Sequence, residues 1–291
     1  MTHCRVNGSL MASLTVRIAV VAPANRVDPT VAARVAALAK SVYGARAELV
    51  FHPQCHLSAG HFAGDDAARA AAFVEVANDA TFDAVWFGRG GYGSGRIAEI
   101  ALPKLTAAAG RKIYLGYSDI GAVLAALYKN EIGRAVHGPM PSDIVRTDGE
   151  AAVRRALSFL IDQQEEAVEP TASSGSKCVA FNLATFSSLI GTPLQPDLTD
   201  HVLMLEEVAE YMYRIDRMMF QIASNPALRK LKGIKLGRCS QVPDSDPPFL
   251  QTEVEVVQYW CARAGIAYLG RADIGHDAEN KVVPFGEMIT S

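Results

Sequence analysis

Several features that would assign the chain to a familiar class of protein are missing from its 291 residues. No apolar stretch approaches the roughly 20 residues that a membrane-spanning helix needs. No basic block occurs, and 28 basic against 31 acidic residues give a net charge of −3. This balance argues against a nucleic-acid partner and favours a neutral or small polar ligand.

The cysteines lack any C-x-x-C pair and are odd in number. The five are Cys4, Cys55, Cys178, Cys239 and Cys261. Scattered, unpaired cysteines argue against a disulfide framework and favour reduced thiols in a cytoplasmic protein. An apolar stretch at residues 10–24 is interrupted by Arg17, so we expect a buried strand there rather than a signal peptide.

Nucleotide-binding signatures are also missing, although residues 88–95 are rich in glycine. No Gly-Lys-Ser/Thr follows, so this segment is not a Walker loop. A dinucleotide fingerprint would follow the first strand, where the chain has Pro23-Ala24-Asn25. Glycines after a strand let main-chain amides approach a phosphate or a developing oxyanion, and a flexible surface loop is the alternative. We expect no cofactor and no metal.

Strands and helices alternate along the first half of the chain. Strands are predicted at residues 16–22, 47–51, 82–87, 112–115 and 134–136, and helices at 29–43, from 65 onward, and at 122–128. Such alternation predicts an α/β fold, with a parallel sheet, right-handed crossovers and helices on both faces. Ligands of such sheets collect at the carboxyl ends of the strands.

The second half carries strands and helices of its own after a helix at residues 148–162. Residues 163–176 are rich first in Gln and Glu and then in Pro, Ser and Gly, with little that could pack. We therefore predict an N-terminal domain at 1–162, a linker at 163–176 and a C-terminal domain at 177–291. Its strands are expected at 202–205, 233–236, 266–269 and 281–283, with helices at 211–223 and 252–264.

The segment Gly116-Tyr117-Ser118-Asp119-Ile120-Gly121 joins a predicted strand to a predicted helix. A serine at such a turn presents its hydroxyl on an exposed elbow, and the first amides of the helix point near the same spot. A nucleophile needs that exposure, and an oxyanion needs such amides. The alternative is a serine N-cap, since the usual G-x-S-x-G elbow has glycine where Ile120 stands.

A nucleophilic serine also needs a base, normally histidine, and an acid that orients it. His276 lies in a Gly-His-Asp loop between two predicted strands, which suits a base that reaches across a cleft. His137 ends a strand and would lie on the ligand edge or be a buried structural histidine. Glu206 and Glu207 end a buried strand, where one carboxylate can face the cleft and the other solvent.

The remaining histidines have weaker claims to a role. His52, His56 and His61 lie close to Cys55, but without a matching carboxylate or second cysteine pair they are predicted to be polar loop residues rather than metal ligands. His201 precedes a strand and is predicted to be a turn residue. The seventh histidine, His3, lies near the beginning of the sequence.

Seven motifs in order make the chain resemble the LD-carboxypeptidase family, over residues 18–286. These serine peptidases include the muramoyl-tetrapeptide carboxypeptidases and the microcin-C immunity peptidases. The motifs are Val20-Val21-Ala22-Pro23, Gly60-His61-Phe62-Ala63-Gly64, Arg89-Gly90-Gly91-Tyr92-Gly93, Gly116-Tyr117-Ser118-Asp119, His137-Gly138-Pro139-Met140, Leu205-Glu206-Glu207, and Gly275-His276 with Pro284-Phe285-Gly286.

The resemblance implies a flavodoxin-like (class I glutamine-amidotransferase-like) N-terminal domain and a smaller C-terminal α/β domain. It also implies a triad in which Ser118 is the nucleophile, Glu206 the acid and His276 the base. The oxyanion hole would comprise the amides of Gly91 and Asp119, with Gly90 supporting the loop. Further candidates, for substrate contacts, are Arg89, Tyr92, Tyr117 and Asn182, and Arg89 or Arg96 could hold a terminal carboxylate.

The sequence departs from the family pattern at one place. Where the family often has two glycines before Asn-Leu, this chain has Ala180-Phe181 before Asn182-Leu183. The departure concerns the local shape of the cleft and leaves the triad residues in place.

The resemblance implies release of the terminal D-alanine from murein tetrapeptides in peptidoglycan recycling, by a homodimer. The bond cut would join an L-centre, diaminopimelate or lysine, to that D-alanine. A microcin-immunity-type peptidase that cleaves a peptide–nucleotide adduct is one alternative. A non-catalytic, flavodoxin-like module whose glycine loop holds phosphate is another, from a different class.

Overall fold

The computed structural model describes residues 15–287, so His3, Cys4 and the start of the first apolar stretch lie outside the described part. Apolar, largely β-branched and aromatic segments form the predicted strands of the first half. They are β1 (Val16–Val21), β2 (Ala47–Phe51), β3 (Ala84–Phe87), β4 (Ile113–Gly116) and β5 (Arg134–His137). They pair in parallel in the order β5-β4-β3-β1-β2, which confirms the predicted sheet.

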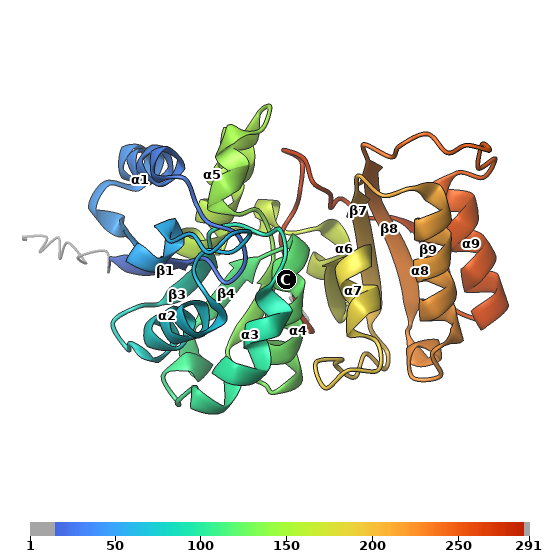
Figure 1. The fold of residues 1–291 in the computed structure, drawn as a ribbon, viewed down its shortest axis with the longest axis horizontal. Coiled ribbons are helices and arrows are strands. Elements are labelled where there is room, and N and C mark those ends of the chain that lie inside the picture. Colours follow the sequence, from blue (N-terminus) through green and yellow to red (C-terminus); the bar gives the residue numbers. More distant parts are fainter. Residues whose placement is uncertain (1–14, 288–291) are drawn as a thin grey trace, which may run out of the picture.

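Helices cover both faces of this sheet (Figure 1). Side chains alternate across a strand, so Ile18 and Val20 of β1 share a core with α1 (Pro29–Tyr43) and α5 (Gly149–Asp162). Ala19 and Val21 belong to the core on the opposite face, which includes α2 (Asp66–Asn78), α3 (Ser94–Ala101) and α4 (Gly121–Lys129). No helix within residues 15–287 is long and apolar enough to cross a membrane.

A second, all-parallel sheet of four strands stands beside the first (Figure 1). It comprises β6 (Cys178–Asn182), β7 (Val202–Val208), β8 (Gly233–Ser240) and β9 (Tyr268–Arg271), in chain order, with α7 (Leu183–Leu189), α8 (Met212–Ser224) and α9 (Glu253–Ala264). Neither β6 nor α7 is predicted from the sequence, because strand runs into helix at Asn182 without any turn signal. Helix α3 is likewise not predicted from the sequence, because its first turn lies inside the glycine-rich segment.

Short helical segments fill the connections. They are Gly44–Arg46, Pro53–His56, Leu102–Lys104, Ala109–Arg111, Ser118–Ile120, Pro141–Val145, Glu165–Ala167 and Leu228–Lys230, with α6 at Pro170–Ser173. Two of these lie in the predicted linker, where Ala167, Val168 and Ala172 are buried. The expectation that this stretch has little to pack is therefore wrong, because its few apolar residues all face the core. The division into domains around it stays a prediction.

The last strand, β10 (Val283–Pro284), corrects the expected sheet membership of residues 281–283. It pairs antiparallel with β5, placing Val283 opposite His137, and so completes the first sheet rather than the second. The chain between β9 and β10 therefore passes from the second sheet to the first. Periodicity cannot reveal this, because a two-residue strand carries no information about its partner.

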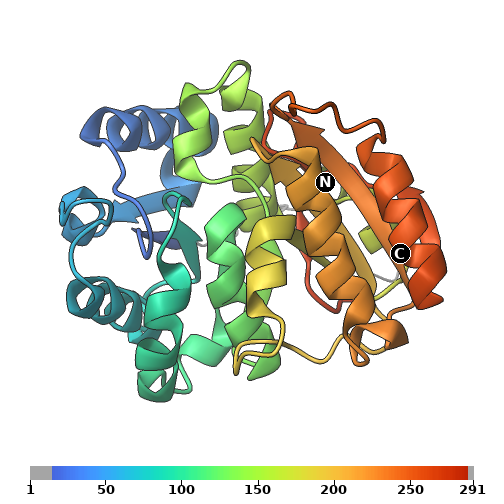
Figure 2. The same cartoon turned by 45° about the vertical axis from the view of Figure 1, so that its right-hand side comes forward.

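Phe181, where the sequence departs from the family pattern, packs between the two halves. Its ring lies 5.1 Å from that of Phe285 and 5.0 Å from that of Phe186, between ring centroids. A Cβ on Gly121 of α4 would lie 3.0 Å from the Phe181 ring, and α4 and α7 lie side by side (Figure 2). The Phe181 side chain, which stands where the family often has glycine, thus fills the core between the two sheets.

We expect F181A to lower the free energy of unfolding by about 3 kcal/mol or more, because it removes a buried ring and leaves a cavity. Urea unfolding followed by circular dichroism measures the change. The matched control is F220A, since the Phe220 side chain is 51% exposed and should cost less than about 1 kcal/mol. Equal losses in the two variants would contradict this packing role.

Candidate active site

Ser118 stands at the junction of β4 and α4, at the carboxyl edge of the first sheet. Its φ is 60°, in the left-handed region that costs an ordinary residue roughly 1–2 kcal/mol. Such strain persists where the surroundings hold it, and it concentrates at functional sites. The N-cap alternative is wrong, because no side-chain capping bond is made to either Ser118–Ile120 or α4.

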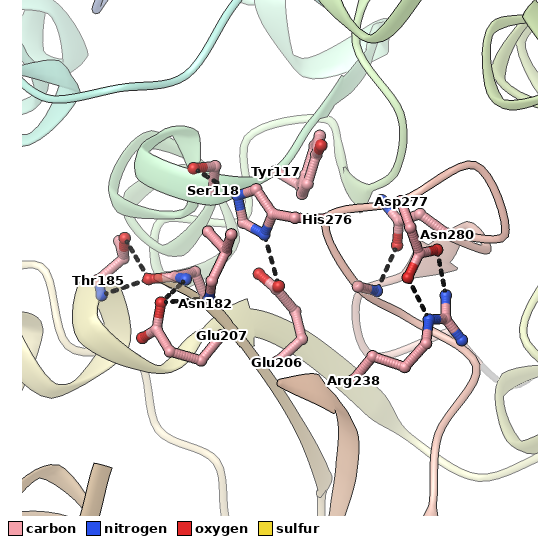
Figure 3. Close-up of polar contacts among 12 residues, drawn as sticks. Tyr117, Ser118, Asn182, Thr185, Glu206, Glu207, Arg238, His276, Asp277 and Asn280 are labelled. Carbon is pink, nitrogen blue, oxygen red and sulfur yellow. Dashed lines mark hydrogen bonds and ion pairs between the residues drawn. The ribbon is translucent and has the colours of Figure 1, made fainter. Parts of the chain in front are cut away.

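Three side chains from separate segments form one hydrogen-bonded chain (Figure 3). The His276 Nε2 lies 3.1 Å from the Ser118 Oγ, and its Nδ1 lies 2.6 Å from the Glu206 Oε2. Ser118 follows β4, Glu206 belongs to β7, and His276 lies in the loop between β9 and β10. This geometry allows the imidazole to take the hydroxyl proton while the carboxylate holds the opposite nitrogen.

The environment of His276 favours its charged form. Burial acts to lower the pKa of the imidazole, but the charge and hydrogen bond of Glu206 outweigh it, so the pKa lies above the ordinary 6.5. Glu206 is 0% exposed, and its second oxygen, Oε1, has no hydrogen-bond partner within residues 15–287. The negative charge of this carboxylate is thus directed at the imidazole.

A glycine on the neighbouring strand makes room for Glu206. The register of β7 against β8 shifts between Leu205 and Glu207, and a Cβ on Gly237 would lie 2.9 Å from the Glu206 Cβ. The role of Gly237 is not predicted from the sequence. A glycine inside a strand is the signal that could have found it, because it marks a bulge or a close approach.

Glu207 is buried as well, so the expectation that one of the two carboxylates faces solvent is wrong. The two side chains do point to opposite sides, but the start of α7 covers Glu207. Its carboxylate accepts hydrogen bonds from the Asn182 Nδ2 at 2.7 Å and from the Ala184 amide at 2.8 Å. Burial raises the pKa of Glu207. Asn182 also caps α7 by accepting from the Thr185 amide.

The glycine-rich loop lies against Ser118. A Cβ on Gly90 would stand 2.9 Å from the Ser118 Cβ and 3.1 Å from its Oγ, so only glycine fits there. Gly91 has φ 110° and borders the same two cavities as the serine. Neither the Gly91 amide nor the Asp119 amide is bonded within the described residues. Two such donors beside a serine can stabilise an oxyanion.

A second network, which the sequence did not reveal, supports His276. The Tyr117 ring lies 4.8 Å from the imidazole, between centroids, and its hydroxyl donates to the Asp143 Oδ1 at 2.8 Å. Arg146 donates from Nε to the same oxygen at 2.9 Å and from Nη1 to the His276 carbonyl at 2.7 Å. Burial raises the pKa of Tyr117 well above 10.

His137 is the buried structural histidine of the two possibilities. Its Nε2 lies 3.0 Å from the Asn280 Oδ1, which also accepts from the Gly275 amide at 3.2 Å. Figure 3 shows Asn280 beside the loop that carries His276. Burial lowers the pKa of His137 to about 4, so it is neutral at pH 7. With the ion pair between Arg238 and Asp277, this contact fixes the loop that carries His276.

Two cavities meet at Ser118. The larger, of about 750 Å³, lies between the glycine-rich loop, α4 and α7, and is bordered by Tyr92, Arg96 and Asn182. The smaller, of about 560 Å³, is bordered by Arg89, Tyr117, Arg146 and His276. Ser118 and Gly91 border both, so a carbonyl placed over the serine would project one substituent into each cavity.

The other histidines and the cysteines stand apart from this arrangement. The His56 Nδ1 lies 2.9 Å from the Val27 carbonyl, the His201 Nε2 lies 2.6 Å from the Tyr128 hydroxyl, and His61 packs on Phe62. Within residues 15–287, no three His, Cys, Asp or Glu side chains converge as metal ligands. Burial raises the pKa of Cys55, Cys178 and Cys239 to about 12, and that of Cys261 to about 11, so these thiols are protonated at neutral pH.

Sequence models of two domains match this chain. The LD-carboxypeptidase N-terminal domain matches residues 18–138, and the LD-carboxypeptidase C-terminal domain matches residues 176–290. A protein named as a carboxypeptidase in Synechocystis sp. is 30% identical to this chain, and the match covers 82% of this chain and 79% of that protein. The chain belongs to the LD-carboxypeptidase family. A protein of this family in Bacillus subtilis, named as a murein peptide carboxypeptidase, is 30% identical over 78% of this chain and 74% of its own.

Solved structures share the fold of this family member. The muramoyltetrapeptide carboxypeptidase from Oxalobacter formigenes gives a TM-score of 0.74 at 22% identity, over 93% of this chain and 92% of that one. The microcin C7 self-immunity protein MccF, in complex with aspartyl sulfamoyl adenosine, gives a TM-score of 0.75 at 17% identity. The match covers 96% of this chain and 98% of that one. At these identities the similarity establishes the two-sheet architecture.

We expect G90A to slow labelling of Ser118 by a fluorophosphonate at least about tenfold, because the added methyl would displace the serine side chain. Mass spectrometry of the labelled protein measures the rate. G110A is the matched control, since a Cβ on Gly110 meets no atom within 4 Å. Labelling of G90A at the wild-type rate would show that the loop does not constrain Ser118.

Proposed function

We propose that this family member is a serine carboxypeptidase that releases the terminal D-alanine of murein tetrapeptides. The hydrogen-bonded chain from Ser118 through His276 to Glu206 carries the proposal, because it is the arrangement that activates a hydroxyl for acyl transfer. The relative named as a murein peptide carboxypeptidase supplies the substrate class. The two cavities support it, since both sides of a scissile bond have room at the serine.

The reaction would proceed through an acyl-enzyme. His276 takes the Ser118 proton as the Oγ attacks the carbonyl of the L-residue, and the oxyanion accepts hydrogen bonds from the Gly91 and Asp119 amides. His276 then passes the proton to the nitrogen of D-alanine, whose bond to the carbonyl breaks. Water deprotonated by His276 hydrolyses the ester and restores Ser118. Glu206 holds the imidazole tautomer and stabilises the imidazolium.

A microcin-immunity-type peptidase is the second candidate, favoured by the shared fold with MccF over nearly the whole chain. Comparing a murein tetrapeptide with an aminoacyl sulfamoyl adenosine, at equal concentrations, separates the two by turnover. A non-catalytic phosphate-binding module predicts that a fluorophosphonate leaves Ser118 unlabelled. The homodimer implied by the resemblance and the cytoplasmic location indicated by the cysteines stay predictions.

Ser118→Ala should reduce D-alanine release from a murein tetrapeptide by about a million-fold, because a nucleophile and its base act as a unit. Mass spectrometry of the products of a defined tetrapeptide gives the rate. Ser41→Ala, an exposed position on α1, controls for loss of a serine and should retain wild-type turnover. Near-normal release by the Ser118 variant would refute the assignment.

The rate should depend on the protonation of His276. A base must be neutral, so kcat/KM falls as pH drops below the pKa of the imidazole, and this acidic limb should lie above 6.5. In E206Q the carboxylate charge that raises this pKa is gone. The limb should therefore move to lower pH, and the plateau should fall by up to about 10⁴-fold because the tautomer is no longer held.

The control for this profile is E207Q, which alters the neighbouring carboxylate that does not contact His276. Its limb should move less than that of E206Q. A limb that stays in place, or moves upward, in E206Q would show that Glu206 does not set the pKa of the base.

A further inference from the structure

The two cavities differ in their access to His276, and this difference assigns the direction in which a peptide lies. Ser118 and Gly91 border both cavities, but His276 borders only the smaller. Under the proposed function, the leaving nitrogen must receive its proton from the imidazole, so it must lie within hydrogen-bond reach of that ring. The leaving D-amino acid therefore belongs in the smaller cavity and the acyl part in the larger.

The smaller cavity must then hold a terminal carboxylate, which is the one charged group of the D-alanine residue while it is still part of the peptide. Its cationic side chains are Arg89 and Arg146, and its carboxylates are Asp28 and Asp143. Asp28 already accepts hydrogen bonds from the amide and hydroxyl of Thr30. Asp143 is buried and accepts from the Tyr117 hydroxyl, the Met140 amide and Arg146.

Arg146 is held in position and keeps one edge available. Its Nε is bonded to Asp143 and its Nη1 to the His276 carbonyl, while Nη2 has no hydrogen-bond partner within the described chain. Its side chain is 36% exposed and borders the cavity. A guanidinium whose orientation is fixed before binding loses little freedom when it accepts a carboxylate, and such charge-assisted hydrogen bonds are strong.

We propose that Arg146 binds the C-terminal carboxylate of the leaving D-amino acid in the smaller cavity. One carboxylate oxygen accepts from the Nη2 of Arg146. The Nη1 of the same guanidinium donates to the main chain of His276, so the substrate carboxylate and the base are positioned by one side chain. This is a specificity contact of the proposed reaction, and it depends on that reaction being the right one.

The arginines that the sequence suggested for this task are placed less well. Arg96 borders the larger cavity. Its Nε donates to the Asp66 Oδ2 at 3.0 Å, and its Nη2 donates to the same oxygen at 2.7 Å. It is therefore paired, and it lies on the acyl side. Arg89 borders the smaller cavity but is exposed, and its Nη1 makes a 3.3 Å bond to the Arg26 carbonyl. No carboxylate contact fixes its guanidinium among residues 15–287.

The test compares two substrates with each enzyme: a lysine-containing murein tetrapeptide with a free C-terminal carboxylate, and the same peptide as its C-terminal amide. The readout is the ratio of kcat/KM for the acid to kcat/KM for the amide. Wild type should strongly favour the acid. R146Q should reduce the ratio by about tenfold to a hundredfold, as expected for loss of a charge-assisted contact.

The acid-to-amide ratio of kcat/KM distinguishes an Arg146 that binds the substrate carboxylate from an Arg146 that only holds neighbouring residues in place. If Arg146 only braced Asp143 and His276, R146Q would slow both substrates equally and leave the ratio unchanged, which would overturn the proposal. R96Q, the matched arginine on the acyl side, should keep the wild-type ratio. A collapse of the ratio in R89Q, with R146Q unaffected, would place the carboxylate at Arg89 and also overturn it.

Two further measurements cover the remaining outcomes. If R146Q does not fold, R146K and inhibition of wild type by D-alanine against D-alaninamide replace it. The lysine variant should show an intermediate ratio, and equal inhibition by the two compounds would overturn the proposal. Wild type that cleaves neither of these peptides, nor the diaminopimelate-containing tetrapeptide, would refute the proposed function itself. That outcome is distinguishable from an active enzyme whose ratio does not depend on Arg146.

Discussion

The contact on which this site depends is the hydrogen bond between the buried Glu206 carboxylate and the His276 imidazole, at 2.6 Å. A carboxylate without water needs a partner, and Glu206 finds one only if the loop after β9 is in place. That loop is fixed at its far end by β10, which belongs to the other sheet. Burial of one charge therefore requires both sheets to be correctly placed.

The serine imposes a second constraint, which is local. Ser118 adopts a left-handed backbone conformation, which the Cβ of a residue other than glycine disfavours. Gly90 must lack a side chain for the glycine-rich loop to lie against Ser118. Packing around the turn compensates this cost, since Ile120 and Gly116 are buried beneath it. The result is a hydroxyl presented at the boundary of two cavities rather than used to cap its own helix.

A single arginine connects the base with the cavity beside it. Arg146 contacts Asp143 and the main chain of His276, and it borders the smaller cavity next to Ser118. Asp143 in turn holds Tyr117, whose ring packs on the imidazole. Groups that orient the base and groups that would orient a substrate thus share one network. In such networks a substitution at a residue that does not touch the substrate can alter specificity.

Local pattern was sufficient for the strands of the first half and for the elbow at Ser118, because side-chain periodicity and turn residues act over a few neighbours. It identified Glu206 and His276 through a family resemblance. The hydrogen bonds that join His276 to Glu206 and to Ser118 span 70 and 158 residues of chain, respectively. Only the tertiary structure decided that both carboxylates of the Glu-Glu pair are buried, that residues 283–284 complete the first sheet, and that Arg146 borders the same cavity as the serine. Burial and pairing depend on which distant segments cover a residue, and no short window of sequence contains that information.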